Sequence, residues 1–167
     1  MIDYKTRLGL LPDDIHMIVS HTWRTLKCYT GGGDLVFATD ALTDGTGDVN
    51  DTGRQDLPSS DTPFGTYRFT GEIIQTRDCD SWGTWASYGP WFLGLYDVDG
   101  QERNLGRAGI GMHGGRQGKY APDPQQTRLL YPTHGCIRVY DDVLEQKIVP
   151  TVRRALRDGK AFVTVVS

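Results

Sequence analysis

Apolar and polar residues alternate in short runs through the first forty residues of the chain. The runs at 17–20 and 25–29 are rich in β-branched and aromatic residues, and the glycines at 31–33 precede a third such run at 35–39. Runs of this composition predict strands, and a glycine-rich turn between two of them predicts a hairpin. We therefore expect antiparallel β-structure over residues 15–39.

Further strand patterns follow at wider spacing. Tyr67 and Phe69 stand two residues apart after a turn sequence, which places both rings on one face of a strand. Residues 93–98 predict another strand, and the Asp-Gly pair that follows predicts a turn back toward 107–112. The apolar run at 161–166 predicts a closing strand.

After residue 138 the pattern changes from a period of two to a helical period. Asp141 or Asp142 is a candidate N-cap of a short helix, and Pro150 suits the first turn of the next one. The Asp-Gly pair at 158–159 is a typical helix end. The fold class expected from these elements is mainly β, an antiparallel β-sandwich or a partly closed barrel, with one or two late helices.

Length and charge limit the kind of protein this is. A chain of 167 residues suits one domain over 1–167, with residues 1–14 peripheral, and it needs no disulfide or metal to fold. The formal net charge of −3 gives no basic surface for nucleic acid. There is no run of 18 apolar residues that predicts a membrane span, and the N-terminus does not resemble a secretory signal.

Candidate chemistry gathers between residues 113 and 138. This segment opens with Gly-Met-His-Gly-Gly around His113 and ends with Thr-His-Gly-Cys-Ile-Arg, which contains His134, Cys136 and Arg138. A thiol becomes a useful nucleophile when it has a base or positive charge nearby, some exposure, and donors for the oxyanion that it creates. The residues here offer all three, so we predict that Cys136 is a nucleophile.

The two halves of this segment resemble the signature of the L,D-transpeptidase (YkuD-type) catalytic domain, which forms unusual crosslinks in bacterial peptidoglycan. The early hairpin and the Thr-Pro-x-Gly-x-aromatic stretch at 62–67 resemble the same family. The resemblance implies that Cys136 is the nucleophile, that His113 is the base, and that the Gly114 carbonyl orients its ring. It also implies that His134 supports the oxyanion site and the thiolate.

Other residues of the signature receive expectations from its chemistry. Backbone N–H groups near Gly135 and Cys136 are expected to bind the oxyanion, with Thr133 beside them. Arg138 is expected to bind a substrate carboxylate, with a structural ion pair as the alternative. The 114–132 stretch between the two halves is slightly longer than the family's usual gap, and we expect a lid loop there.

The function implied by the resemblance is acyl transfer on peptidoglycan stem peptides, by 3-3 crosslinking or D-amino-acid exchange. An L,D-carboxypeptidase, or a secreted toxin that targets peptidoglycan, would use the same site with another acceptor, and a non-catalytic peptidoglycan-binding module is the alternative of another class. No cofactor is expected. We expect action in the cell envelope, with export as an effector by a specialised secretion system as one route.

Two metal sites and one disulfide are alternatives. His113, His134, Cys136 and Asp123 are zinc-ligand types, although the chain lacks the paired short spacings of structural zinc. The loop from Asp44 to Gln55 resembles part of a calcium loop but lacks its glycine and glutamate, so a solvated loop is predicted instead. The remaining cysteines, Cys28 and Cys79, would pair only in an oxidising compartment.

The aromatic residues between 82 and 96 have two interpretations. Trp82, Trp85, Tyr88 and their neighbours are expected to fill the core and a sheet face, because aromatic rings bury large apolar areas. The alternative is that some of them line a groove for a sugar-peptide ligand.

Overall fold

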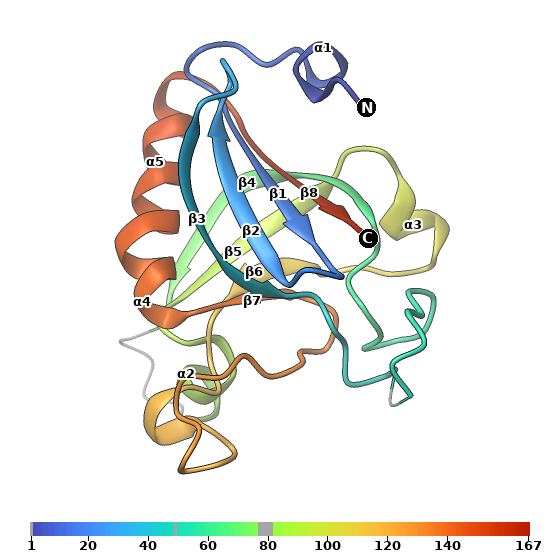
Figure 1. The fold of residues 1–167 in the computed structure, drawn as a ribbon, viewed down its shortest axis with the longest axis vertical. Helices are drawn as coiled ribbons and strands as arrows, with labels where there is room; N and C mark the ends of the chain where they lie inside the picture. Colours follow the sequence, from blue (N-terminus) through green and yellow to red (C-terminus); the bar gives the residue numbers. More distant parts are fainter. Residues whose placement is uncertain (1, 49, 77–81) are drawn as a thin grey trace.

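The computed structural model describes residues 2–48, 50–76 and 82–167 of the chain. Its centre is a closed barrel in which the strands lie in the order β1, β2, β3, β7, β6, β5, β4, β8 (Figure 1). The strands are β1 (Ile15–Ser20), β2 (Thr25–Thr30), β3 (Leu35–Leu42), β4 (Gly65–Gln75), β5 (Trp91–Asp97), β6 (Gly111–His113), β7 (Ile137–Val139) and β8 (Ala161–Val166).

Most neighbouring strands are antiparallel, as expected, but two pairs are not. β1 and β8 run parallel with Met17 opposite Val163, and β6 and β7 run parallel with His113 opposite Arg138. The first pair closes the barrel between the two ends of the chain. The second pair is the one that matters for chemistry, because it brings the two halves of the cysteine signature side by side.

The helical elements are short except at the C-terminal end. They are α1 (Tyr4–Leu8), α2 (Trp82–Tyr88), α3 (Gln101–Asn104), the 3₁₀ turn η1 (Gly118–Tyr120), α4 (Asp141–Val143), the π-helical η2 (Leu144–Ile148) and α5 (Val149–Asp158). α4, η2 and α5 form one continuous helical run, which agrees with the expectation of one or two late helices. Pro150 has no N–H to donate to the preceding turn, which is consistent with the widened π segment directly before it.

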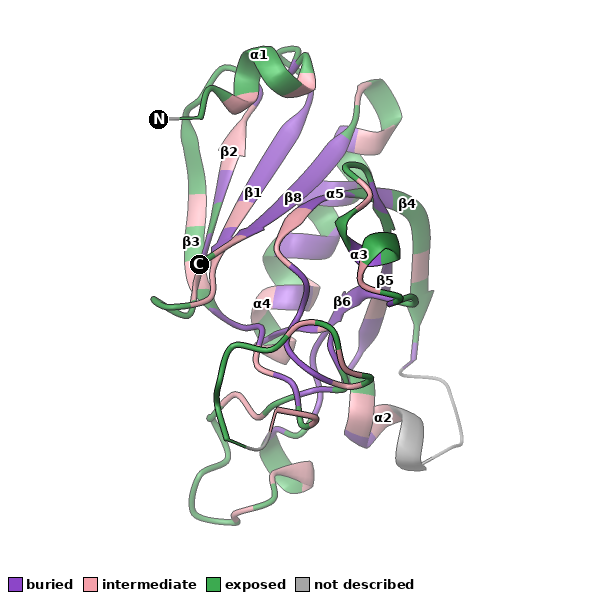
Figure 2. Cartoon of the chain, turned by 90° about the vertical axis from the view of Figure 1, so that its right-hand side faces the viewer, coloured by how far each residue is buried: buried purple, intermediate pink, exposed green. Residues whose placement is uncertain are grey.

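The core lies inside the barrel and is completed by the last helix. Met17, Leu26 and Met112 are fully buried and belong to one hydrophobic cluster, and Val149 and Val152 of α5 pack against the same cluster. In Figure 1, α5 runs along one side of the barrel, whereas β3 carries mostly exposed residues and β8 is buried along nearly its whole length (Figure 2).

The strand and helix predictions are confirmed in type, and the barrel alternative is the one observed. β1, β2 and β3 fall within residues 15–42, and the closing strand occupies the predicted 161–166. The assignment of 1–167 to one domain stays a prediction. Within the described ranges, no helix is long and apolar enough to cross a membrane.

Cys28 lies in the barrel core as a free thiol, and burial raises its pKa to about 12. Cys79 lies outside the described residues, as does Val49 of the calcium-like loop. The side chain of Trp82 is also outside the described part of the structure, so the interpretation of the aromatic stretch is tested only by its later members.

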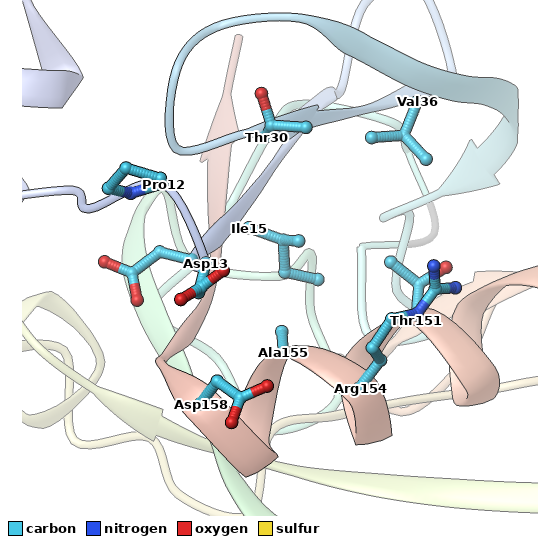
Figure 3. A pocket seen from close by; sticks show the side chains of 10 residues that line it. Pro12, Asp13, Ile15, Thr30, Val36, Thr151, Arg154, Ala155 and Asp158 are labelled. Carbon is cyan, nitrogen blue, oxygen red and sulfur yellow. The ribbon is translucent and has the colours of Figure 1, made fainter.

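A hollow between α5 and the start of β1 is lined by a mixture of charged and apolar side chains (Figure 3). Asp13, Arg154 and Asp158 lie around it, with Ile15 and Ala155 at its floor. Its lining contains no cysteine or histidine. We therefore place the candidate chemistry elsewhere, at the end of the barrel where β6 and β7 emerge.

Candidate active site

The parallel pairing of β6 and β7 sorts their side chains between the core and the surface. Met112 and Ile137 are register partners and point into the barrel, where both are fully buried. Successive residues of a strand point to opposite faces, so His113 and Arg138 point away from the core on the same side. Cys136 precedes Ile137 and joins them on that side.

These side chains open into a pocket of about 310 Å³. His113, Cys136 and Arg138 lie within its lining together with His134, so the two halves of the signature, far apart in sequence, meet in one cavity. The other lining residues are Thr46, Ser87, Tyr88, Phe92, Gly109, Arg116, Pro132 and Thr133.

The ring of His113 is fixed by its own neighbour in the chain. Nδ1 lies 2.7 Å from the Gly114 carbonyl oxygen, and because a carbonyl cannot donate, Nδ1 must carry the proton of the neutral ring. The ring also packs edge-on against Tyr88, at 4.9 Å between centroids, and stacks near Phe92 at 5.9 Å. Nε2 takes part in no hydrogen bond with any described residue, so it is the free basic nitrogen.

The environment of His113 keeps this ring neutral. Burial lowers its pKa to about 4, and the positive charge of Arg138 acts in the same direction, while the bond to Gly114 opposes them. A neutral imidazole with a fixed tautomer accepts a proton at Nε2 throughout the neutral range. The ring of His113 is therefore able to accept a proton at Nε2.

Cys136 is partly exposed in the pocket, with its Sγ 3.8 Å from the Gly109 carbonyl oxygen. Burial raises the pKa of this thiol, although a backbone hydrogen bond from Gly111 and the charges of Arg138 and Arg107 lower it. The sequence argument expects an imidazole that stabilises a thiolate. The directions of the two pKa shifts instead favour a neutral thiol and a neutral imidazole in the same pocket.

Arg138 is buried and its donors are largely occupied by backbone carbonyls. Nε donates to Gly114 O at 3.0 Å, and one terminal nitrogen donates to Tyr131 O at 2.7 Å and Pro132 O at 3.0 Å. The other terminal nitrogen donates to Ser87 O at 3.0 Å. Among the described residues, these contacts occupy four of its five N–H groups. This arrangement favours a structural role, through carbonyl bonds rather than the ion pair that the sequence suggests.

The loop that carries Cys136 is closed by Thr133. Its hydroxyl donates to the Cys136 carbonyl at 2.7 Å and accepts the Gly135 N–H at 3.0 Å. Gly135 has a φ of 114°, and a β-carbon there would collide with the guanidinium of Arg107. Glycine is therefore required by both conformation and space. The Gly135 N–H is engaged in this state, which leaves the Cys136 N–H as the better candidate for an oxyanion donor.

His134 lies at the exposed rim of the pocket. Its Nδ1 is 3.2 Å from the Ser59 hydroxyl and 3.4 Å from the Thr46 hydroxyl. These contacts tie the ring to neighbouring loops. They differ from the single short carbonyl contact that fixes the ring of His113.

The sequence model of the YkuD L,D-transpeptidase catalytic domain matches residues 15–147. The chain belongs to this family. The matched range contains the whole pocket described above. It includes both histidines of the signature and Cys136.

Solved structures agree on the fold. Bd1075 of Bdellovibrio bacteriovorus is 16% identical with a TM-score of 0.59, and the similarity covers 92% of this chain and 47% of that one. The helical cell shape determining protein Pgp2 of Campylobacter jejuni is 22% identical with a TM-score of 0.55, over 90% of this chain and 46% of that one. This chain thus spans about half the length of these relatives. No curated protein matches it.

Arg107 holds the surroundings of the L,D-transpeptidase pocket together, and the sequence does not single it out. It is buried, and one terminal nitrogen donates to Gln55 O, Ser60 Oγ and Asp61 O at 2.8, 2.9 and 3.1 Å. Because Gly135 lies against the same guanidinium, Arg107 links the 55–61 loop to the cysteine loop. A single arginine in a polar stretch gives no local signal of such a role.

Asp141 also has a role other than the one expected. It begins α4 but does not cap it, since its Oδ1 accepts the Gly115 N–H at 2.8 Å. A β-carbon at Gly114 would collide with the same carboxylate oxygen. Asp141 therefore positions the glycine turn whose carbonyl orients His113, and the prediction of an Asp141 or Asp142 cap is wrong.

The zinc alternative finds no support in this geometry. Among the described residues, the groups whose ligand atoms approach within 4.8 Å of one another do not include His113, His134 and Cys136 together, or Asp123.

Proposed function

We propose that the chain catalyses cysteine-dependent acyl transfer on peptidoglycan stem peptides, as an L,D-transpeptidase. The observation that carries the proposal is the pairing, in one pocket, of the Cys136 thiol with a buried His113 whose Nδ1–H is held by the Gly114 carbonyl. Membership of the YkuD family and the two halves of its signature support the same assignment.

In the proposed reaction, His113 Nε2 takes the thiol proton as Cys136 Sγ attacks the carbonyl of the L-centre at the third stem residue. The tetrahedral oxyanion then collapses, the bond to the terminal D-amino acid breaks, and the imidazolium gives its proton to the departing amine. A thioester remains on Cys136. An amine of a second stem attacks the thioester carbonyl and His113 takes the proton of that amine. As the new peptide bond forms, the C–S bond breaks and the imidazolium returns the proton to the Cys136 sulfur.

The Cys136 N–H is proposed to bind the oxyanion, since Thr133 already accepts the Gly135 N–H in the resting state. An oxyanion donor of this kind contributes on the order of 3 kcal/mol to the transition state. Arg138 is proposed to hold the pocket walls through its carbonyl bonds, with its one remaining N–H available to a substrate carboxylate.

Two rings of the pocket wall are the proposed ligand contacts. Tyr88 is exposed and Phe92 half-buried, and both lie beside His113 at the mouth of the cavity. Flat rings with one exposed face suit the apolar faces of a sugar-peptide. This supports the groove interpretation for these two members of the aromatic stretch.

The experiment is mass spectrometry of products formed from purified muropeptides by the parent chain and by Cys136→Ala. We expect crosslinked dimer or D-amino-acid exchange with the parent and none with the variant, which loses only one heavy atom. Trimmed tripeptide alone would assign an L,D-carboxypeptidase that uses water. Turnover by Cys136→Ala within tenfold of the parent would exclude covalent catalysis by this residue.

Location and partners follow from the proposed substrate. Peptidoglycan stems lie outside the cytoplasm, so we propose that the chain acts in the cell envelope. Export as an effector stays a prediction, as does the toxin interpretation.

A further inference from the structure

A second group of ionisable side chains lies behind the cysteine loop. His21 follows β1, Asp44 follows β3 and Asp61 precedes β4, and one ligand atom of each lies within 4.8 Å of those of the others. His21 and Asp44 are half-buried, and Asp61 is 2% exposed. The three residues come from three different connections at the pocket end of the barrel.

Hydrogen bonds involve one ring nitrogen of His21 and one carboxylate oxygen of Asp61, and the other polar atom of each residue has none among the described residues. His21 Nδ1 lies 2.8 Å from the Thr43 hydroxyl, which fixes the ring and leaves Nε2 toward Asp61. Asp61 Oδ1 accepts the Gly45 N–H at 2.9 Å. Asp61 Oδ2 is buried and has no hydrogen-bond partner among the described residues.

An unpartnered carboxylate oxygen in the interior is costly, because it has lost water and gained no donor. His21 Nε2 is a candidate donor, but it lies 3.7 Å from Asp61 Oδ2, which is too long for a hydrogen bond. Two ligands of a tetrahedral ion with bonds of about 2.0–2.1 Å lie roughly 3.4 Å apart. The spacing is thus closer to that of two metal ligands than to that of a donor and an acceptor.

The contacts around the group are those that metal ligands receive in proteins. A ligating histidine gives its other ring N–H to a neighbouring oxygen, and His21 Nδ1 has the Thr43 hydroxyl for this contact. A ligating carboxylate also accepts a hydrogen bond, and Asp61 Oδ1 accepts the Gly45 N–H. Asp44 is held by Arg24 through Oδ2 at 3.0 Å, and its Oδ1 lies 3.4 Å from His21 Nδ1, on the same ring edge as the Thr43 hydroxyl. Two carboxylates and one neutral imidazole balance the charge of a divalent ion.

We propose that His21 Nε2, Asp44 Oδ1 and Asp61 Oδ2 bind one divalent transition-metal ion of the zinc class, with water completing the coordination. One imidazole and two carboxylates suit zinc or its first-row neighbours better than calcium, which prefers six or more oxygens.

The ion would act as a clamp on the catalytic loop. The Asp44 carbonyl accepts the Thr133 N–H at 3.2 Å, and the Thr46 N–H donates to the Thr133 carbonyl at 2.8 Å. Arg107, which lies against Gly135, donates to the Asp61 carbonyl at 3.1 Å. A metal ion bound by His21, Asp44 and Asp61 would therefore restrain the contacts of Thr133 and Arg107 that hold the cysteine loop, without contacting the Cys136 thiol.

The test titrates zinc chloride into chelator-treated full-length chain by calorimetry, in a Cys136→Ser background so that the thiol cannot ligate. We expect one zinc per chain, and at least a tenfold loss of affinity in His21→Gln and in Asp61→Asn. Asp61→Asn retains the Oδ1 acceptor for Gly45. Asp56→Asn is the matched control, because Asp56 is an exposed carboxylate of the same loop that pairs with Arg54, and its affinity should equal that of the background.

Thermal unfolding gives a second readout that separates loss of metal from loss of fold. Without metal, Asp61→Asn should melt no lower than its background, since it removes a buried charge, and zinc should raise the midpoint of the background but not of this variant. Absence of stoichiometric zinc binding, equal affinity in Asp61→Asn, or a preference for calcium over zinc would each overturn the proposal.

Discussion

Two buried histidines lie on opposite sides of the barrel, His113 in β6 and His16 in β1. Both are 3% exposed, both point out of the barrel beside a core methionine, and burial lowers the pKa of each to about 4. A local segment covers each ring, with Tyr4 of α1 packing on His16 at 5.0 Å and Tyr88 packing on His113. By burial and pKa alone they are equivalent.

The two rings differ in what their nitrogens face. His16 Nε2 lies 2.7 Å from the Thr164 hydroxyl, which in turn lies 2.9 Å from the Thr66 hydroxyl. This ring nitrogen is therefore already engaged by buried side chains. His113 uses Nδ1 for the Gly114 carbonyl and lines the pocket that holds Cys136. A shifted pKa therefore does not distinguish the two rings, whereas the fixed tautomer of His113 and its place in the pocket of Cys136 do.

The largest expected difference between these histidines is in activity. His113→Gln should lower kcat/KM for muropeptide crosslinking by roughly 100-fold to 10,000-fold, because the variant lacks the proposed general base. His16→Gln keeps a polar contact for Thr164 and should stay within about twofold of the parent. Initial rates at pH 7 measure both, with folding checked by circular dichroism. Similar losses in the two variants would remove the distinction drawn here.

The same two substitutions should change the pH dependence of the free energy of unfolding by similar amounts. The folded-state pKa of each ring, about 4, lies below the unfolded value of about 6.5, so the unfolded chain binds more protons between these limits. The contribution of each neutral ring to the free energy of unfolding is therefore complete above pH 6.5 and is lost as the pH falls toward 4. Each histidine contributes a slope of up to about 1.4 kcal/mol per pH unit.

Urea unfolding of the parent, His16→Gln and His113→Gln at several pH values between 4 and 6.5 checks this expectation. Both variants should lose one histidine's share of the slope, since glutamine does not titrate. An unchanged slope in either variant would mean that the ring is protonated in the folded state as readily as in the unfolded chain.

The sequence predicts those parts of the site that are local in the chain. Gly114 follows His113 directly, so the carbonyl that orients the ring is inherent in the sequence, and the 133–138 signature places Thr133 and Arg138 around the cysteine. The strands are predicted because their apolar runs are local as well.

What the sequence does not predict depends on contacts between distant segments. Arg107 meets the 55–61 loop across about fifty residues of chain, and the parallel pairing of β1 with β8 joins its two ends. The same holds for His21 and Asp61, whose proximity appears only when the barrel closes. No local pattern marks these residues, because each is an ordinary polar side chain in a turn.

The smallest expected effect concerns His134, the other histidine of the pocket. Its ring is exposed and is held by contacts of 3.2 and 3.4 Å to two hydroxyls, so His134→Ala should lower kcat/KM by less than tenfold. Comparison of kcat/KM for His134→Ala and His113→Gln shows which histidine contributes more to the reaction. A larger loss in His134→Ala than in His113→Gln would reverse the assignment of the base.

The resting state of the Cys136 and His113 pair is the central claim, and the pH dependence of thiol alkylation tests it most directly. Iodoacetamide labelling of Cys136, mapped by mass spectrometry, gives the apparent pKa of that thiol, with Cys136→Ala as the background for the other cysteines. We predict a value above the ordinary thiol pKa of about 8.5, because burial disfavours the thiolate and His113 is neutral. A value near 6 or below would show a thiolate and imidazolium ion pair and would contradict the neutral pair.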